Sequence, residues 1–207
     1  MNKQKVHIAI VVLAAGEDTL LKYPKPLLPW GNSTLLGHAI KEVVKTQIND
    51  IYVVLGHEYD SVFERHKHFP VHFVKNPNYK DGFFTGLEEC MKWISKTDVE
   101  AVMFLYGDQP QVDHNYLKEM IHSYHKSNNA IVVTNQQGDF DFPVIFHKNY
   151  FSILQQLDNK QERLNYIINQ HIENTVILAP ELPFFHVNNK DGYDKLHQDW
   201  FGEINPI

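Results

Sequence analysis

Residues 11–29 read VVLAAGEDTLLKYPKPLLP, and this stretch decides the fold. The apolar run that leads into it, residues 8–13, is short, rich in β-branched side chains and unbroken by polar residues, which predicts a buried strand of a parallel sheet. The small residues 14–16 follow, and a turn of this kind lets the backbone approach an anionic ligand closely. Its bare N–H groups can form a concavity for phosphate, and Lys25 can add a positive charge on a phosphoryl oxygen.

Strand-like and helix-like segments alternate along the chain. The predicted strands are residues 6–13, 51–55, 71–74, 101–105, 130–134, 143–147 and 174–178. The predicted helices are residues 33–46, 59–66, 82–95, 113–125, 149–157, 161–170 and 191–200. Alternation at this spacing predicts βαβ units. We therefore expect an α/β fold in one domain over residues 1–207, with a three-layer, Rossmann-like, mostly parallel sheet and helices on both faces.

Composition limits the classes of partner. The net charge of -6 and the pI near 6.1 argue against a nucleic-acid partner, which needs a basic face, but not against a nucleotide. The single cysteine, Cys90, excludes an internal disulfide framework, fits a reducing compartment and is expected to be packed in the core. No apolar run approaches the roughly 20 residues of a membrane span. We expect no signal peptide, no membrane partner and a cytoplasmic location.

A second motif follows the predicted strand 101–105. It reads Tyr-Gly-Asp-Gln-Pro over residues 106–110. A carboxylate at the carboxyl end of a parallel strand faces the crevice where ligands bind in open α/β sheets. Asp108 is therefore a candidate ligand for Mg²⁺, which prefers hard oxygen donors and bridges protein to phosphate. Without the phosphate-loop pattern nearby, the same residue could equally cap a turn before Pro110.

Histidine is frequent, with 13 residues in the chain. One cluster contains His66, His68 and His72, and a second is made by residues 114, 122 and 125. No cysteine accompanies them and no HExxH pattern is present, so solvent-exposed clusters are the better interpretation than a metal site.

The motifs together resemble the MobA-like NTP transferase family, and within it the molybdenum cofactor cytidylyltransferase-like branch. Residues 13–29 resemble LAAGxSxRMGxxKxLLP, and residues 107–110 match GDQP. Three further segments resemble family motifs in the same order: residues 76–87 (N-x(4,5)-G-M-x-x-S-L), 138–146 (G-x-x-G-H-P-V-L-F) and 185–191 (D-[IV]-[DN]-T-P-E-D). The resemblance extends from about Val6 to Leu196 and implies the fold of the nucleotide-diphospho-sugar transferases.

The resemblance also implies a reaction and a site. An NTP, expected to be CTP, would give its NMP to a phosphorylated acceptor such as molybdopterin, with release of pyrophosphate and with Mg²⁺ as the cofactor. The implied catalytic residues are Lys25 and Asp108. The implied metal ligands are Asp108 and Asn188, although Asn188 could also be part of a plain turn or helix cap. The implied nucleotide-binding residues are Leu13, Ala14, Ala15, Gly16, Lys22, Lys25, Gly82 and Thr85.

Several positions depart from the family pattern. Asp18, Leu20 and Lys22 stand where the family has Ser, Arg and Gly, and the Gly-His pair near the acceptor is replaced by residues 141–142. Loss of the arginine predicts weaker phosphate binding, because it would neutralise the terminal phosphates. Two alternatives therefore stay open: a catalytically weak nucleotide-binding or regulatory protein on the same fold, and a nucleotidyltransferase for a sugar phosphate.

Overall fold

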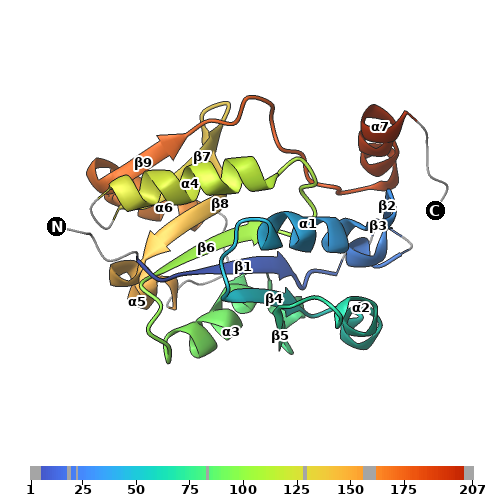
Figure 1. Ribbon diagram of the computed structural model, residues 1–207, viewed down its shortest axis with the longest axis horizontal. Coiled ribbons are helices and arrows are strands. Elements are labelled where there is room, and N and C mark those ends of the chain that lie inside the picture. Colours follow the sequence, from blue (N-terminus) through green and yellow to red (C-terminus); the bar gives the residue numbers. More distant parts are fainter. Residues whose placement is uncertain are drawn as a thin grey trace.

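The computed structural model describes residues 6–17, 20–21, 23–82, 84–127, 130–155 and 162–202. Within them a seven-stranded sheet has the order β5-β4-β1-β6-β8-β7-β9, with helices on both faces (Figure 1). The strands are β1 (Ile8–Ala14), β4 (Ile51–Leu55), β5 (His72–Lys75), β6 (Ala101–Tyr106), β7 (Ile131–Gln136), β8 (Asp139–His147) and β9 (Thr175–Leu178). Each strand predicted from the sequence overlaps one of these.

Two apolar cores cover the two faces of the sheet. On one face, alternate β1 residues such as Val11 pack with α3 (Phe84–Ile94), α5 (Phe151–Leu154) and α6 (Glu162–Gln170). On the other, residues such as Val12 pack with α1 (Leu35–Val44), α2 (Tyr59–His66) and α4 (His114–Lys126). Adjacent strand residues point to opposite faces, so an unbroken apolar strand is what a two-faced core requires. The expected three-layer α/β architecture is confirmed.

β8 is the exception to the parallel arrangement. It pairs antiparallel with both β6 and β7, whereas the β1–β4, β1–β6, β4–β5 and β7–β9 pairs are parallel. The chain reverses between β7 and β8 through Gln137 and Gly138, which both have positive φ values of 56° and 104°. Two such residues are typical of the tight turns that join antiparallel strands. β8 also begins four residues earlier than the predicted strand 143–147.

Helix boundaries differ from the sequence expectations in detail. The helix predicted from residue 33 begins at Leu35, because Ser33 and Thr34 form strand β3, which pairs with β2 (Pro29–Trp30) in a small hairpin. The helix predicted over 149–157 is shorter: a 3-10 turn, Lys148–Tyr150, leads into α5. Residues 156, 157 and 161 of the predicted helices lie outside the described residues. Further 3-10 turns are Lys25–Leu27, Tyr79–Asp81 and Ile172–Asn174.

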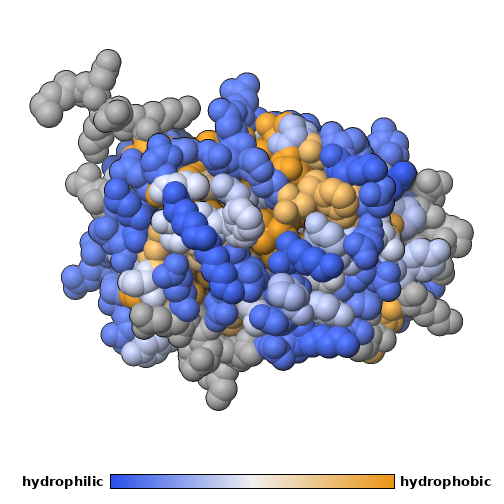
Figure 2. Space-filling view, turned by 90° about the horizontal axis from the view of Figure 1, so that it is seen from below, coloured by the Kyte–Doolittle hydropathy of each residue, from blue (hydrophilic) through white to orange (hydrophobic). Residues whose placement is uncertain are grey.

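The last helix, α7 (Lys190–Phe201), packs away from the main sheet. Tyr193 is fully buried with Leu28, Trp30 and Val187 in a third apolar cluster, and its hydroxyl donates to the carbonyl of Pro29. This packing ties the segment before α7 to the loop after β1. No helix among the described residues has the length and apolar character needed to cross a membrane. One face of the molecule carries a group of apolar side chains among hydrophilic ones (Figure 2).

Candidate active site

A cleft of about 1370 Å³ lies at the carboxyl ends of β1 and β6. In the sheet, β6 lies on one side of β1. The next strand of this sheet along the chain after β1 is β4, and it lies on the other side of β1. Ligands bind in open α/β sheets at such reversals of strand order. The lining residues used below are Leu13, Ala14, Ala15, Gly16, Glu17, Lys25, Tyr79, Lys80, Gly82, Tyr106, Asp108, Gln136, Asp139, Phe140, Asp141, Phe142, Leu164, Asn165, His186 and Asn188.

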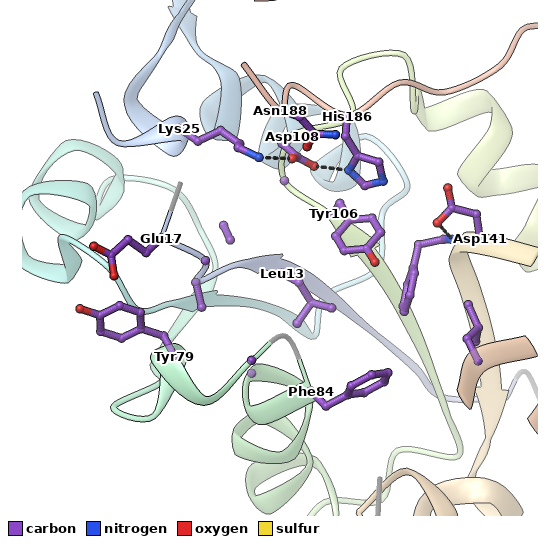
Figure 3. Close-up of a pocket in the computed structure, with 18 of the residues that line it drawn as sticks. Leu13, Glu17, Lys25, Tyr79, Phe84, Tyr106, Asp108, Asp141, His186 and Asn188 are labelled. Carbon is purple, nitrogen blue, oxygen red and sulfur yellow. Dashed lines mark hydrogen bonds and ion pairs between the residues drawn. The ribbon is translucent and has the colours of Figure 1, made fainter. Parts of the chain in front are cut away.

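Asp108 lines the cleft and lies between two basic side chains, Lys25 and His186 (Figure 3). The Lys25 Nζ atom donates to Oδ2 of Asp108 over 2.9 Å, and Nδ1 of His186 donates to Oδ1 over 3.0 Å. The other ring nitrogen of His186, Nε2, lies 3.2 Å from the side-chain amide nitrogen of Gln109. Both carboxylate oxygens are therefore held by donors from distant parts of the chain.

The charges of this group are mutually stabilised. Burial pushes the pKa of Asp108 upward, but the hydrogen bond from His186 and the charge of Lys25 outweigh it and hold the pKa below its ordinary value. Burial lowers the pKa of His186, and the hydrogen bond to Asp108 outweighs this effect and raises it. Asp108 is thus an ionised carboxylate inside a cleft, which is the state that a cation or an oriented base needs.

Close backbone packing brings Asp108 to the loop after β1. A Cβ atom on Gly107 would lie 3.2 Å from the Cβ of Ala14 and 3.1 Å from the Leu36 side chain, so a side chain at this position would be in tight contact with both. Gly56, at the end of β4, is even tighter: its Cβ would meet the Ala15 carbonyl oxygen at 2.6 Å. Glycine is needed at both positions for close approach rather than for an unusual φ angle.

The segment before α7 presents its polar residues to Asp108. Val187 is fully buried, and its N–H donates to the Asp108 carbonyl oxygen over 3.3 Å. In an extended segment the residues on either side of a buried one share the opposite face. His186 and Asn188 accordingly both line the cleft beside Asp108 (Figure 3).

The cleft brings together most of the residues predicted from the sequence. Leu13, Ala14, Ala15, Gly16, Lys25, Gly82, Asp108 and Asn188 all line it. A Cβ atom added to Gly16 would meet nothing within 4 Å, so this part of the loop is open to a ligand. Gly82 has a φ of 110°, a conformation that favours glycine, directly before α3.

Thr85 has a local role in the structure. It does not line the cleft, and its hydroxyl shares its one hydrogen between the carbonyls of Gly82 and Asn78 and accepts from the Asn76 side chain over 2.9 Å. These bonds hold the turn that places Gly82 at the cleft. Contact between Thr85 and a nucleotide stays a prediction.

The structure describes some of the positions that depart from the family pattern and not others. Asp18 and Lys22 lie outside the described residues, so their predicted contributions to phosphate binding stay predictions. The Leu20 side chain is 71% exposed and is not among the lining residues, whereas Leu21 is buried in the cluster around Trp30. Leu21 therefore anchors the loop, and Leu20 leaves the cleft without the family arginine.

Asp108 and Asn188 are the residues that fit a divalent cation. Both supply hard oxygen atoms from neighbouring segments that line the same cleft. Among the described residues no group of three or more His, Cys, Asp or Glu side chains is arranged to hold a metal. A site with few protein ligands suits Mg²⁺, which keeps several waters and takes further oxygens from phosphates.

The sequence reasoning missed two residues of the site, His186 and Asp141. Both had been noticed only as parts of motifs, without a role. For His186 a signal was present: it alternates with Asn188 around an apolar residue, which predicts a shared face. For Asp141 the signal was the family motif over residues 138–146, which puts residues 141–142 near the acceptor, although the place of Asp141 in the cleft also depends on the reversal of β8.

The expectation of solvent-exposed histidine clusters was wrong for His66. This residue is buried; its Nδ1 bonds to the carbonyl of Val62 over 2.7 Å and its Nε2 to the Thr34 hydroxyl over 2.6 Å. It belongs to the packing between α1 and α2. His68 and His72 are exposed, as expected. Cys90 is buried in the core, as expected, and burial raises the pKa of its thiol.

Comparison with known proteins finds relatives that are similar in sequence and others that are similar in fold. The chain is 32% identical over 116 residues to the bifunctional protein GlmU of Halorhodospira halophila, which covers 55% of this chain but 24% of that protein, so the chain spans about a quarter of the length of this relative. Among solved structures, Rv0371c of Mycobacterium tuberculosis in complex with manganese superposes with a TM-score of 0.74 at 20% identity, covering 94% of this chain and all of the other (100%).

A cytidylyltransferase from Leptospira borgpetersenii gives a TM-score of 0.74 at 17% identity, covering 95% of this chain and 88% of the other. Likeness at this level of identity shows the shared fold. The decisive comparison is with a family model, that of the MobA-like NTP transferase domain, which matches residues 10–175 and so takes in Gly16, Lys25 and Asp108. Because that match extends over most of the chain, the protein belongs to the MobA-like NTP transferase family.

Proposed function

We propose that this protein is a divalent-metal-dependent nucleotidyltransferase that moves an NMP from an NTP to a phosphorylated acceptor and releases pyrophosphate. The observation that carries this proposal is the Asp108 carboxylate held between Lys25 and His186, beside the open loop at Gly16. Attack of one phosphate on another needs positioning and charge stabilisation rather than a protein nucleophile. The site offers that kind of chemistry.

Each residue of the site has its own role in the proposed reaction. The loop at residues 14–16 receives the phosphates of the NTP, and Lys25, 2.9 Å from Asp108, neutralises a phosphoryl oxygen. Asp108 and Asn188 would hold Mg²⁺, which would supply positive charge to offset the negative charge of the phosphates. His186 fixes the Asp108 carboxylate through its Nδ1–H, so that the carboxylate is oriented before the nucleotide arrives.

We propose CTP as the nucleotide, supported by the resemblance to the cytidylyltransferase-like branch and by the similarity in fold to a cytidylyltransferase. Two acceptor classes fit the proposal. Molybdopterin is the acceptor that the resemblance implies. A sugar phosphate is the alternative, because the Gly-His pair that the family has near its acceptor is replaced here by Asp141 and Phe142, which line the cleft.

The proposal is tested by nucleotide binding and by pyrophosphate release. CTP, GTP, ATP and UTP are titrated with and without Mg²⁺, and pyrophosphate is then measured with a panel of phosphorylated acceptors. We expect Mg²⁺-dependent binding, strongest for CTP, and turnover with one acceptor class. Lys25→Met and Asp108→Asn should lower kcat/KM by about a hundredfold or more, comparable to the loss of one donor to a developing charge.

Matched controls are available at the C-terminal end of α2, in Glu64 and the capping residue Lys67. Lys67→Met and Glu64→Gln remove the same charges from an exposed ion pair outside the cleft and should leave turnover unchanged. A protein that binds no nucleotide under any of these conditions would contradict the proposal. One that binds nucleotide but turns over no acceptor would instead be a nucleotide-binding or regulatory protein on this fold.

A further inference from the structure

We propose that the acceptor carries a cationic nitrogen group at the end away from its phosphate, and that Asp141 recognises this group. The inference rests on the proposed function, because it assigns the β8 side of the cleft to the acceptor. It adds the chemical class of the acceptor, which the family match does not give.

The cleft has two unlike halves on either side of Asp108. Glu17 and Tyr79 lie on one side, and Asp141 lies on the other, beyond Tyr106 (Figure 3). On the β8 side the described lining residues are Tyr106, Gln136, Asp139, Phe140, Asp141, Phe142, Leu164 and Asn165. That half therefore presents two carboxylates, aromatic rings and neutral amides. The basic side chains that line the described part of the cleft are Lys25, Lys80 and His186, and none of them comes from β7, β8 or α6.

Asp141 is oriented by neutral donors. The Gln136 Nε2–H group donates to Oδ2 of Asp141 over 2.9 Å, and the N–H of Phe142 donates to Oδ1 over 2.7 Å. Gln136 cannot turn its amide around freely, because its Oε1 accepts the N–H of Phe184. No cation in the described part of the chain forms an ion pair with Asp141. The carboxylate is thus fixed in place by neutral donors. His186 attracts it through space, but the Nδ1–H of that ring is bonded to Asp108, so Asp141 can still take a cationic ligand.

Aromatic rings stand beside this carboxylate. The ring centroids of Tyr106 and Phe142 are 4.7 Å apart in an edge-to-face arrangement, and Tyr106 lies 4.5 Å from the His186 ring. Phe142 is buried and Tyr106 half-buried, so the rings form a firm wall. Aromatic faces attract cations, and a carboxylate beside them adds a point of attraction for the same charge. A second anionic group on the acceptor would instead face two carboxylates in a partly dehydrated cleft.

The test compares acceptors that differ in one group. O-phosphoethanolamine, 2-hydroxyethyl phosphate and phosphoglycolate share a phosphate and a two-carbon chain but end in ammonium, hydroxyl and carboxylate. 6-Amino-6-deoxyglucose 1-phosphate and glucose 1-phosphate form a second matched pair, in which the amine is at the end of the sugar away from the phosphate. Binding is measured by calorimetry with Mg²⁺, with and without α,β-methylene CTP.

We expect the nitrogen-bearing member of each set to bind at least tenfold tighter than the hydroxyl member, and the carboxylate member to bind weakest. Asp141→Asn keeps the size of the side chain and should reduce that preference to less than threefold, without changing the affinity for Mg²⁺-CTP. Glu64→Gln on α2 is the matched control and should keep the full preference.

Equal binding within each set, preference for the hydroxyl or carboxylate member, or an unchanged preference in Asp141→Asn overturns the inference. So does failure of every nitrogen-bearing acceptor to bind. These outcomes are separate from failure of the proposed function, which shows as absent Mg²⁺-dependent nucleotide binding. Because the acceptors are titrated without nucleotide as well, the preference is measured in either case.

Discussion

The hydroxyl of Thr34 makes two hydrogen bonds to different parts of the structure. It caps α1 by accepting the N–H of Gly37 over 3.0 Å, and it also bonds to the buried ring of His66. Loss of a helix cap costs about 1 kcal/mol, and a buried ring nitrogen left without a partner costs roughly 1–3 kcal/mol more. We expect Thr34→Val to lower the free energy of unfolding by about 2–4 kcal/mol, measured by urea denaturation.

Thr97→Val is the matched control for this variant. Its hydroxyl bonds to the Ile94 carbonyl at the exposed end of α3, so its loss should cost less than about 1 kcal/mol. Equal effects of the two variants would contradict the role given to Thr34. The sequence predicted the helix to begin at residue 33, two residues before its start at Leu35. The reason is the hairpin of β2 and β3, two residues per strand, which is too short to give a periodic pattern.

At the scale of elements, α1 and α4 are joined by a pH-sensitive contact. Glu42 of α1 accepts from both the ring and the backbone N–H of His114, the first residue of α4, and pairs with Lys45. Burial pushes the pKa of Glu42 upward, but the hydrogen bonds from Lys45 and His114 outweigh it and lower the pKa to about 2. Because the folded-state pKa is below the ordinary value, this stabilisation is complete above about pH 4.5 and is lost as the pH falls toward 2.

We expect Glu42→Gln to lower the free energy of unfolding at pH 7 by on the order of 1–3 kcal/mol. The difference between variant and wild type should shrink as the pH is lowered from 4.5 toward 2. Denaturation at a series of pH values measures both. Glu64→Gln, whose carboxylate is exposed, is the control. A difference that stays constant down to the acid limit of folding would show that Glu42 acts through packing alone.

The sequence predicted the parallel strands well because βαβ units leave a strong local pattern. Each strand of β1, β4 and β6 is an unbroken apolar run, and each is followed by a helix of matching period. β8 was not predicted to run antiparallel, because strand direction depends on which neighbour it joins, and its pairing with β6 spans some 40 residues of chain. The turn at Gln137 and Gly138 was the available local signal.

For the whole molecule, a ligand that binds only the folded state must raise its stability. Binding at a hundred times Kd stabilises by about 2.7 kcal/mol, and in a domain of this size each kcal/mol raises Tm by about 2–4 °C. We expect Mg²⁺ with CTP at that ratio to raise Tm by roughly 5–10 °C. CTP with a chelator, and Asp108→Asn with the full mixture, should show little shift. A full shift in that variant would place the nucleotide elsewhere.

The halves of the cleft also differ in how far the sequence could predict them. Gly16 follows the end of β1, Lys25 begins a short 3-10 turn, and Asp108 follows the end of β6. Their convergence therefore follows from the order of the strands. The acceptor side depends on the reversed β8 and on the start of α6, which come together only through long-range packing. That is why Asp141 was predicted only as part of a motif near the acceptor, with no role of its own.

The bond between Lys25 and Asp108 has a consequence for binding order. The lysine occupies the carboxylate that a divalent ion needs, so the two cations compete for Asp108 until phosphate draws the lysine away. We expect Lys25→Met to have opposite effects on two affinities: Mn²⁺ alone should bind about tenfold tighter, while the NTP binds more weakly. Titration of each ligand separately would reveal this antagonism, and a loss of both affinities would contradict it. If the antagonism is observed, Lys25 occupies the Asp108 carboxylate while no nucleotide is bound. It thereby lowers the affinity of the nucleotide-free protein for a divalent ion.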